Sequence, residues 1–165
     1  QNSYFTKGTT RNNIYRDVFS TGISLTTKFS KVLNYTNPNL EINLLRHVIQ
    51  PTISYGYIFK PSVDSSELLT HGVSRSSVIN LSLRNKLQTK RKLKNNPMSE
   101  TIALIDLNIT TSYFPYDYMT INNNDRDFSN IKFDLEITPY AYTKTRWYLF
   151  YDQYTGHLDS SYSSR

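Results

Sequence analysis

Apolar and polar residues alternate with a period of two over several stretches of this chain, and no other feature constrains its fold as strongly. The pattern is clearest at 130–139, where the odd positions are apolar and most even positions are charged. Successive side chains of a strand point to opposite faces, so this stretch predicts a strand with one apolar and one polar face. The same pattern covers 78–88 and 106–113. Weaker versions at 49–60 and 23–32, and an apolar stretch at 146–152, predict further strands.

No apolar run is long enough for a membrane-spanning helix, which takes roughly 18 apolar residues. The longest runs are 102–105 and 147–151. Mean hydropathy is −0.54, although 14% of the residues are aromatic. A strand that crosses a membrane is apolar only at every second position, so a low mean hydropathy is compatible with a β-barrel in a lipid bilayer.

The predicted connections alternate in length. They are short near 37–39 and 143–145, intermediate at 94–99, and long at 61–77 and 116–127. This alternation is typical of an up-and-down barrel with short periplasmic turns and long outer loops. The sequence therefore predicts an all-β, antiparallel meander of about six strands. Aromatic residues near the strand ends are expected to form girdles at the membrane interfaces.

Six strands are too few to close a membrane barrel, which takes at least about eight. The chain begins at Gln1 without a basic and apolar leader segment. We therefore expect residues 1–165 to form one partial segment of a larger outer-membrane barrel, with no separate domain. The expected location is the bacterial outer membrane.

Strand parity predicts which residues face lipid and which face the barrel lumen. From 79 to 139, odd apolar positions should meet lipid and even polar positions the lumen, unless a bulge intervenes. The expected lipid-facing residues are Ile79, Leu81, Leu83, Leu107, Ile109, Phe133, Leu135 and Ile137. The expected lumen-facing residues are Asn80, Ser82, Arg84, Lys86, Asp106, Asn108, Thr110, Lys132, Asp134 and Glu136.

Nothing in the sequence predicts catalysis, a metal or a cofactor. The chain has no Cys, and His47, His71 and His157 have no second ligand at a suitable spacing on a shared strand face. His47 is expected to pack or hydrogen-bond at the barrel rim. The three lumen carboxylates are expected to pair with Arg84, Lys86 or Lys132 across strands, rather than to form an acid pair with a raised pKa.

Two sequence features limit the strand pairing. Pro51 and Pro139 each remove a ladder hydrogen bond, so they should lie at strand ends or at weakly paired edges. The net charge is +6, with a basic run at Lys90, Arg91, Lys92 and Lys94 that is expected in an exposed turn. Such a run attracts any polyanion, including the phosphates of a glycolipid or nucleic acid, without identifying it.

The stretch 45–57, LRHVIQPTISYGY, resembles a strand of the LptD family of lipopolysaccharide-assembly outer-membrane proteins, also called OstA or Imp. The residues that carry the resemblance are Arg46, His47, Pro51, Ser54 and Tyr55. The stretch 79–90, INLSLRNKLQTK, is similar to a following strand of that family, and 106–113 and 131–139 match two more. The resemblance covers about 11–154.

The LptD resemblance implies a large barrel that inserts lipopolysaccharide into the outer leaflet. Its implied partners are lipopolysaccharide, outer-membrane lipid, a plug lipoprotein and the periplasmic bridge proteins of the same pathway, without nucleic acid. The chain departs from the family pattern in lacking the periplasmic jelly-roll domain, a signal peptide and a Cys pair. Two alternatives stay open: a wall segment of another barrel, such as a porin or receptor, and a soluble basic β-domain that binds nucleic acid. The soluble domain would have to cover its apolar face with a second sheet.

Overall fold

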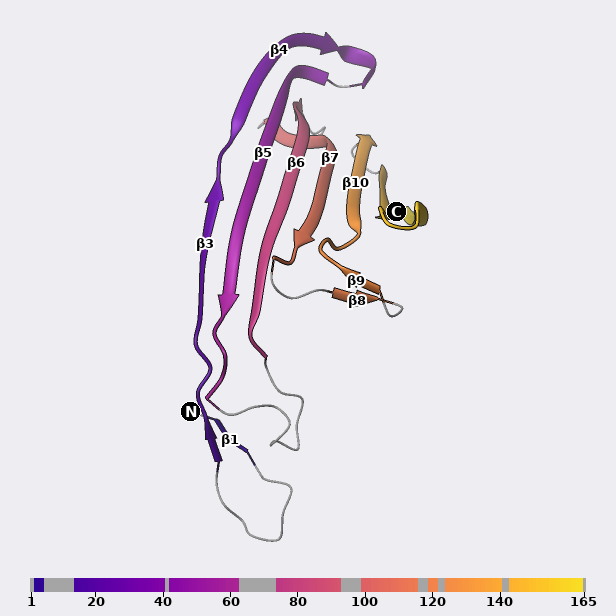
Figure 1. The fold of residues 1–165 in the computed structure, drawn as a ribbon. Helices are drawn as coiled ribbons and strands as arrows, with labels where there is room; N and C mark the ends of the chain where they lie inside the picture. Colours follow the sequence, from indigo (N-terminus) through magenta and orange to yellow (C-terminus); the bar gives the residue numbers. More distant parts are fainter. Residues whose placement is uncertain are drawn as a thin grey trace.

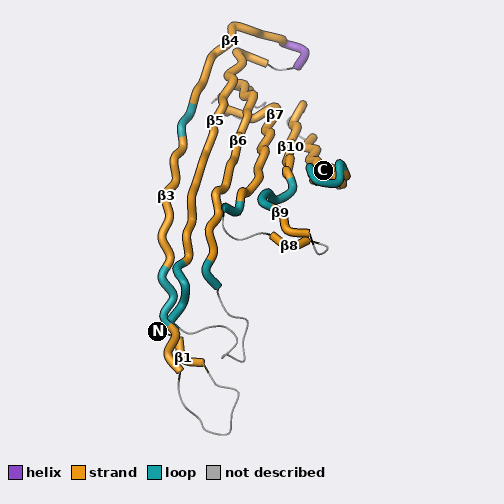
Figure 2. Tube along the Cα trace, in the orientation of Figure 1, coloured by secondary structure: helices purple, strands orange, loops and turns teal. Residues whose placement is uncertain are grey.

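The computed structural model describes residues 2–4, 14–40, 42–62, 74–92, 99–115, 119–121, 124–140 and 143–164. Over these residues the protein is all-β, with one short 3-10 helix, η1 (Pro38–Leu40), and no α-helix. Figure 2 shows strand along nearly the whole described trace, with η1 as its one helical turn. The all-β prediction is confirmed.

One large antiparallel sheet dominates the structure (Figure 1). Its eight strands are β3 (Ser20–Thr26), β4 (Phe29–Asn37), β5 (Ile42–Ile58), β6 (Ser76–Lys92), β7 (Ser99–Tyr113), β10 (Ile131–Tyr140), β11 (Thr143–Asp152) and β12 (His157–Ser164). Two small pairs accompany it: β1 (Asn2–Tyr4) with β2 (Ile14–Arg16), and β8 (Met119–Ile121) with β9 (Asn124–Arg126).

The strand order is that of a meander, β12-β11-β10-β7-β6-β5-β3, with β4 also paired to β5. Both β3 and β4 lie along the same side of β5, one after the other. They are two consecutive segments of one edge of the sheet, which is interrupted at 27–28 opposite Pro51. The antiparallel up-and-down meander predicted from connection lengths is confirmed.

The sheet has eight strands rather than about six, for two local reasons. The strand expected at 23–32 is split into β3 and β4. The stretch after residue 156 resembles a polar tail because four of its nine residues are Ser, yet 157–164 pair with β11 in full register. The hydrogen bonds of a neighbouring strand, rather than the apolar pattern, make β12 a strand. The 3-10 turn after residue 37 confirms the short connection expected there, whereas 143–145 belong to β11 and not to a turn.

The sheet has two ends that differ in their connections. At the short-connection end, β4 ends beside the start of β5, β6 ends beside the start of β7, and β10 ends beside the start of β11. At the long-connection end the chain passes from β5 to β6, from β7 to β10 and, through 153–156, from β11 to β12. The last of these is short, an exception to the expected alternation. Figure 1 shows β5 and β6 reaching beyond β7 toward the long-connection end.

Register shifts gather at the short-connection end. They fall between Leu33 and Thr36 in β4, at Leu44 in β5, at Leu104 in β7, and between 137 and 140 in β10. Bulges bend a strand and increase its local twist. The few buried apolar side chains are Ile42, Val48 and Leu104, so the described sheet is a single layer without a thick core.

The prediction of an exposed turn for the basic run is wrong. Lys90, Arg91 and Lys92 lie in β6, because 99–101 of β7 continue the ladder beside them. The Arg91 side chain is only 1% exposed, and its Nη2 donates a hydrogen bond to the Pro139 carbonyl oxygen at 2.9 Å. Lys94 lies outside the described residues.

The expected position at a strand end holds for Pro139 but not for Pro51. Pro139 lies at the irregular end of β10, as expected. Pro51 lies in the middle of β5, directly opposite Leu83 of β6, which contradicts placement at a strand end. The Pro51 carbonyl oxygen accepts from the Thr27 N–H at 3.2 Å, at the break between β3 and β4. The missing N–H of Pro51 therefore coincides with the weakest part of that edge.

Candidate functional site

One face of the large sheet is apolar across its middle. Leu83 lies opposite Ile109, and Ile109 lies opposite Phe133. Directly opposed residues in an antiparallel pair share a face. The same pairings put all eight residues expected to face lipid on this one surface, here called the apolar face: Ile79, Leu81, Leu83, Leu107, Ile109, Phe133, Leu135 and Ile137.

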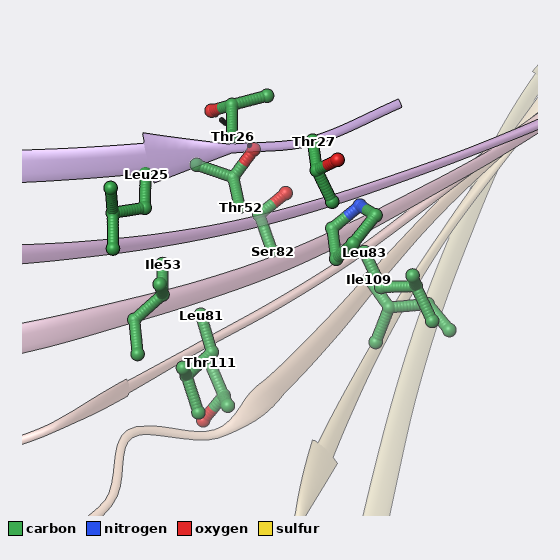
Figure 3. A pocket seen from close by; sticks show the side chains of 11 residues that line it. Leu25, Thr26, Thr27, Thr52, Ile53, Leu81, Ser82, Leu83, Ile109 and Thr111 are labelled. Atoms are coloured by element: carbon green, nitrogen blue, oxygen red, sulfur yellow. Dashed lines mark hydrogen bonds between the residues drawn. The ribbon is translucent and has the colours of Figure 1, made fainter. Parts of the chain in front are cut away.

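The apolar face is not covered by any described part of the chain. Contacts between described elements are confined almost entirely to hydrogen-bonded neighbours. Leu25 is 64% exposed, Ile53 46% and Leu83 40%. Figure 3 shows these side chains lining an open apolar groove of about 560 Å³ across β3, β5, β6 and β7. A contiguous apolar surface of this kind is unusual on a soluble monomer and indicates a lipid or protein contact.

Aromatic rings gather on the apolar face at the long-connection end. Tyr57 and Phe59 meet edge to face with centroids 4.7 Å apart, and Phe59 lies 5.3 Å from Phe19. Tyr113 of β7 and Phe128 lie 4.8 Å apart. We refer to these residues, with Tyr55, as the aromatic belt. The clustering of rings expected near the strand ends is confirmed at this end of the sheet.

A polar pair on β5 and β6 interrupts the apolar face. His47 and Asn85 occupy the face by register, and the His47 Nε2 lies 2.6 Å from the Asn85 Oδ1. Lys31 of β4 lies directly opposite His47. The expected hydrogen bond of His47 is confirmed, whereas the polar Asn85 at an odd position was not anticipated.

The opposite face is polar, and the pairings place all ten residues expected to face the lumen on it. Asn80 is opposite Ser112, Ser82 is opposite Thr110, and Lys86 is opposite Asp106. The same face continues into β10, and we call it the polar face: Asn80, Ser82, Arg84, Lys86, Asp106, Asn108, Thr110, Lys132, Asp134 and Glu136. The structure thus brings the two predicted sets to opposite faces, and their contact with lipid or lumen water stays a prediction.

Charges on the polar face are neutralised within a central cluster. Arg84 donates two hydrogen bonds to the Asp106 carboxylate at 2.9 and 2.7 Å, and the Lys86 Nζ lies 3.1 Å from the same carboxylate. These are the partners expected for Asp106. Glu136, which lies directly opposite Asp106, is paired with Lys144 at 2.9 Å. A bidentate pair with Arg146 satisfies Asp134.

The expected partners are therefore wrong for Asp134 and Glu136, whose partners Arg146 and Lys144 both lie in β11. Residues 143–145 were expected to form a turn, and the apolar stretch at 146–152 does not indicate its faces. The register puts Arg146, Tyr148 and Phe150 on the polar face and Trp147 and Leu149 on the apolar face. The Arg146 guanidinium also stacks on the Tyr148 ring, with its carbon 4.8 Å from the centroid. Only the register could assign these faces.

The long-connection end carries a further ion pair, between Arg126 of β9 and Asp152, the last residue of β11. The Arg126 Nη1 donates to the Asp152 Oδ2 at 2.7 Å, and the Arg126 side chain is 4% exposed. Asp152 also accepts from the backbone N–H of Tyr154 at 2.9 Å. Arg126, together with these turn bonds, lowers the pKa of Asp152 to about 2. We call this arrangement the rim clamp.

One expectation about the histidines is wrong. Because the tail is a strand, His157 and Asp159 share a face, and the His157 Nε2 lies 3.1 Å from the Asp159 Oδ1. Both side chains are largely exposed. His71 lies outside the described residues. Within the described ranges, no three His, Cys, Asp or Glu residues lie together so as to hold a metal ion.

The residues that carry the LptD resemblance all lie in β5. Arg46 and Ser54 are on the polar face, whereas His47, Pro51 and Tyr55 are on the apolar face. Parity holds along β7 only as far as Leu104, where the bulge places Ala103 opposite Gln88 on the polar face and Ile102 opposite Thr89. The parity prediction allowed for such a bulge, which the sequence does not mark.

No protein-family model matches the chain, and no match is found among curated proteins or solved structures. No helix among the described residues is long and apolar enough to cross a membrane.

Proposed function

We propose that this chain forms part of the wall of an outer-membrane β-barrel, with the apolar face toward lipid and the polar face toward the lumen. The observation that carries the proposal is the uncovered apolar face on a single-layer antiparallel meander. A bilayer would cover that face without a second sheet, and paired or closed strand edges would satisfy the backbone.

The height of the apolar face suits a bilayer. Residues 79 to 87 of β6 span roughly 26 Å along the strand, which at a tilt of about 40° is a height of roughly 20 Å. The aromatic belt extends this band toward the roughly 25 Å typical of outer-membrane barrels. The rings also belong at the interface, since their apolar bodies are buried in lipid there while hydroxyl groups stay hydrated.

The polar face suits a lumen. Its central carboxylates each have a cation partner on a neighbouring strand, which leaves little local net charge. By the resemblance of β5 and β6 to the LptD family, we assign the barrel to lipopolysaccharide insertion into the outer leaflet. This assignment makes lipopolysaccharide the cargo, and the plug lipoprotein and bridge proteins its partners.

Matched arginine substitutions at adjacent positions test the barrel. In the complete gene product, Leu83→Arg and Leu107→Arg should each cost about 2–4 kcal/mol near the bilayer midplane, because the charge enters lipid. Ser82→Arg and Asn108→Arg are their controls, because these neighbours lie on the polar face. The readouts are outer-membrane yield and heat-modifiable gel mobility. Equal tolerance at the two parities, or damage mainly at Ser82 and Asn108, would refute the barrel.

The cargo has a separate test. When the protein is depleted from the organism that encodes it, newly made lipopolysaccharide should fail to reach the cell surface while other outer-membrane proteins still assemble. Normal surface lipopolysaccharide after depletion would instead favour the wall of a porin or receptor.

A further inference from the structure

A second groove, of about 340 Å³, lies at the short-connection end and has a different chemistry from the central cluster. Arg46 of β5, Val32 of β4 and Gln88 of β6 are directly opposed and line it together. Lys90, two residues beyond Gln88, and Leu44 complete its main walls. We call it the basic groove.

Among the residues that the structure describes, no carboxylate lines the groove beside its cations. No Asp or Glu is among the residues that line the groove, whereas the central cluster contains Asp106, Asp134 and Glu136. Arg46 makes one long contact, from its Nη2 to the Ser30 Oγ at 3.4 Å. Lys90 lies opposite Thr101, a neutral residue. On the polar face, therefore, the cations of the central cluster are paired with carboxylates, whereas those of the basic groove remain available to an external anion.

The spacing of the two cations suits a single phosphate group. Arg46 and Lys90 are diagonal neighbours on adjacent strands, which places their backbones roughly 7–8 Å apart. Both side chains are exposed, long and flexible enough to converge on one group between them. A guanidinium binds phosphate oxygens in bidentate fashion, and an ammonium adds a point charge.

An apolar residue in a strained backbone conformation lies beside these cations. Leu44 has φ +60°, in the left-handed region that costs a non-glycine residue about 1 kcal/mol. The Thr89 side chain, 2% exposed, holds this bulge by accepting from the Asn43 N–H at 3.1 Å and donating to the Leu44 carbonyl oxygen at 3.0 Å. Leu44 nevertheless stays 40% exposed at the groove.

We propose that the basic groove binds the phosphate-bearing end of a glycolipid, with Arg46 and Lys90 on the phosphate and Leu44 and Val32 against the adjoining lipid carbons. The choice of an amphiphile over a free anion rests on these two apolar walls. The inference also rests on the proposed function, and it deepens that function by assigning the cargo contact to named residues at one end of the polar face.

Binding of labelled lipid A to the full chain, refolded in zwitterionic detergent micelles, tests the inference. Arg46→Gln with Lys90→Gln should weaken binding about tenfold or more, because charge-assisted hydrogen bonds are lost. Lys86→Gln is the matched control, since Lys86 is a cation of the same face already paired with Asp106, and its affinity should stay within about twofold. Arg46→Lys with Lys90→Arg should retain most of the binding, which separates loss of charge from misfolding.

Three results would overturn the inference: unchanged affinity in the double Gln variant, an equal loss in Lys86→Gln, or equally tight binding of dephosphorylated lipid A. Inorganic phosphate that displaces lipid A at concentrations close to that of the lipid would assign the groove to a free anion and also overturn it. Failure of the barrel proposal is distinguishable from these results, because the chain would then be folded and monomeric without detergent.

Discussion

At the residue scale, the polar pair on the apolar face has the clearest energetic consequence. His47 and Asn85 form a hydrogen-bonded pair across β5 and β6 on the apolar face, with Lys31 of β4 directly opposite His47. A polar group in such surroundings is tolerated only when it is hydrogen-bonded. The pair therefore depends on both partners being present.

Replacing one partner of the His47–Asn85 pair should destabilise the folded chain more than replacing both. We expect Asn85→Leu alone to destabilise the folded chain in micelles by about 1–3 kcal/mol, because it leaves the His47 ring without its partner. The double variant His47→Leu/Asn85→Leu should recover most of that loss. Urea unfolding followed by Trp147 fluorescence measures both, and additive losses in the double variant would contradict the coupling.

The rim clamp has a pH dependence of defined sign. The rim clamp lowers the Asp152 pKa from its ordinary value of 3.8 to about 2 in the folded protein. The clamp therefore contributes stability that is fully present above about pH 4. That contribution is lost as pH falls from about 4 through 2. Amide hydrogen exchange at the Tyr154 and Thr155 N–H groups should therefore accelerate over this range, beyond its intrinsic pH dependence.

Asp152→Asn is the control for the rim clamp. It should remove the additional acid-dependent step, because an amide does not titrate in this range, and exchange at Tyr154 and Thr155 at pH 6 should be somewhat faster because the charge pair with Arg126 is lost. A wild-type step that persists in Asp152→Asn would assign it to another group.

At the element scale, the edge formed by β3 and β4 is paired on one side only, with β5. The edge is interrupted at 27–28, and Pro51 opposite the break has no N–H to donate. Every residue of β3 is exposed. Its pairing with β5 therefore depends on backbone contact, which is close at Gly22.

Two directly opposed glycines give a matched test of this edge. A Cβ at Gly22 would lie 2.9 Å from the Tyr55 carbonyl oxygen, whereas a Cβ at Gly56 would meet only a Val78 methyl at 3.5 Å. Gly22→Ala should therefore displace β3 and cost about 1–3 kcal/mol, as overpacking does. Gly56→Ala should change stability by less than about 0.5 kcal/mol. Hydrogen exchange across 20–26 checks this, and similar exchange in the two variants would be the contrary result.

At the scale of the whole molecule, the single-layer architecture determines how the chain should behave in solution. Its apolar face is exposed from β3 to β12, with Leu158 56% and Tyr162 73% exposed at the far edge. Water contact over such a surface is unfavourable in proportion to its area. Detergent, lipid or another protein surface must cover it.

We expect the purified chain to self-associate in buffer and to give a discrete β-rich species in detergent micelles. Circular dichroism and light scattering with and without detergent measure this. A folded monomer in buffer would contradict the membrane proposal and favour a soluble β-domain, whose apolar face would then be covered by residues outside the described ranges.

Local sequence by itself was sufficient for the strands and the two faces at 79–88, 106–113 and 131–137, because side-chain alternation follows directly from strand geometry. It also placed Asp106 beside Arg84 and Lys86, since the charges sit at matching parity in strands that are neighbours in a meander. Tertiary structure alone decided what depends on register: the faces of β11, the partners of Asp134 and Glu136, and the strand β12 in a serine-rich stretch. It also decided the bulge at Leu104, which reverses parity, and the burial of Arg91, which a hydrophilic run of sequence does not indicate. The physical reason is that hydrogen bonds between strands join residues far apart in the chain, so local composition cannot specify which residues they bring together.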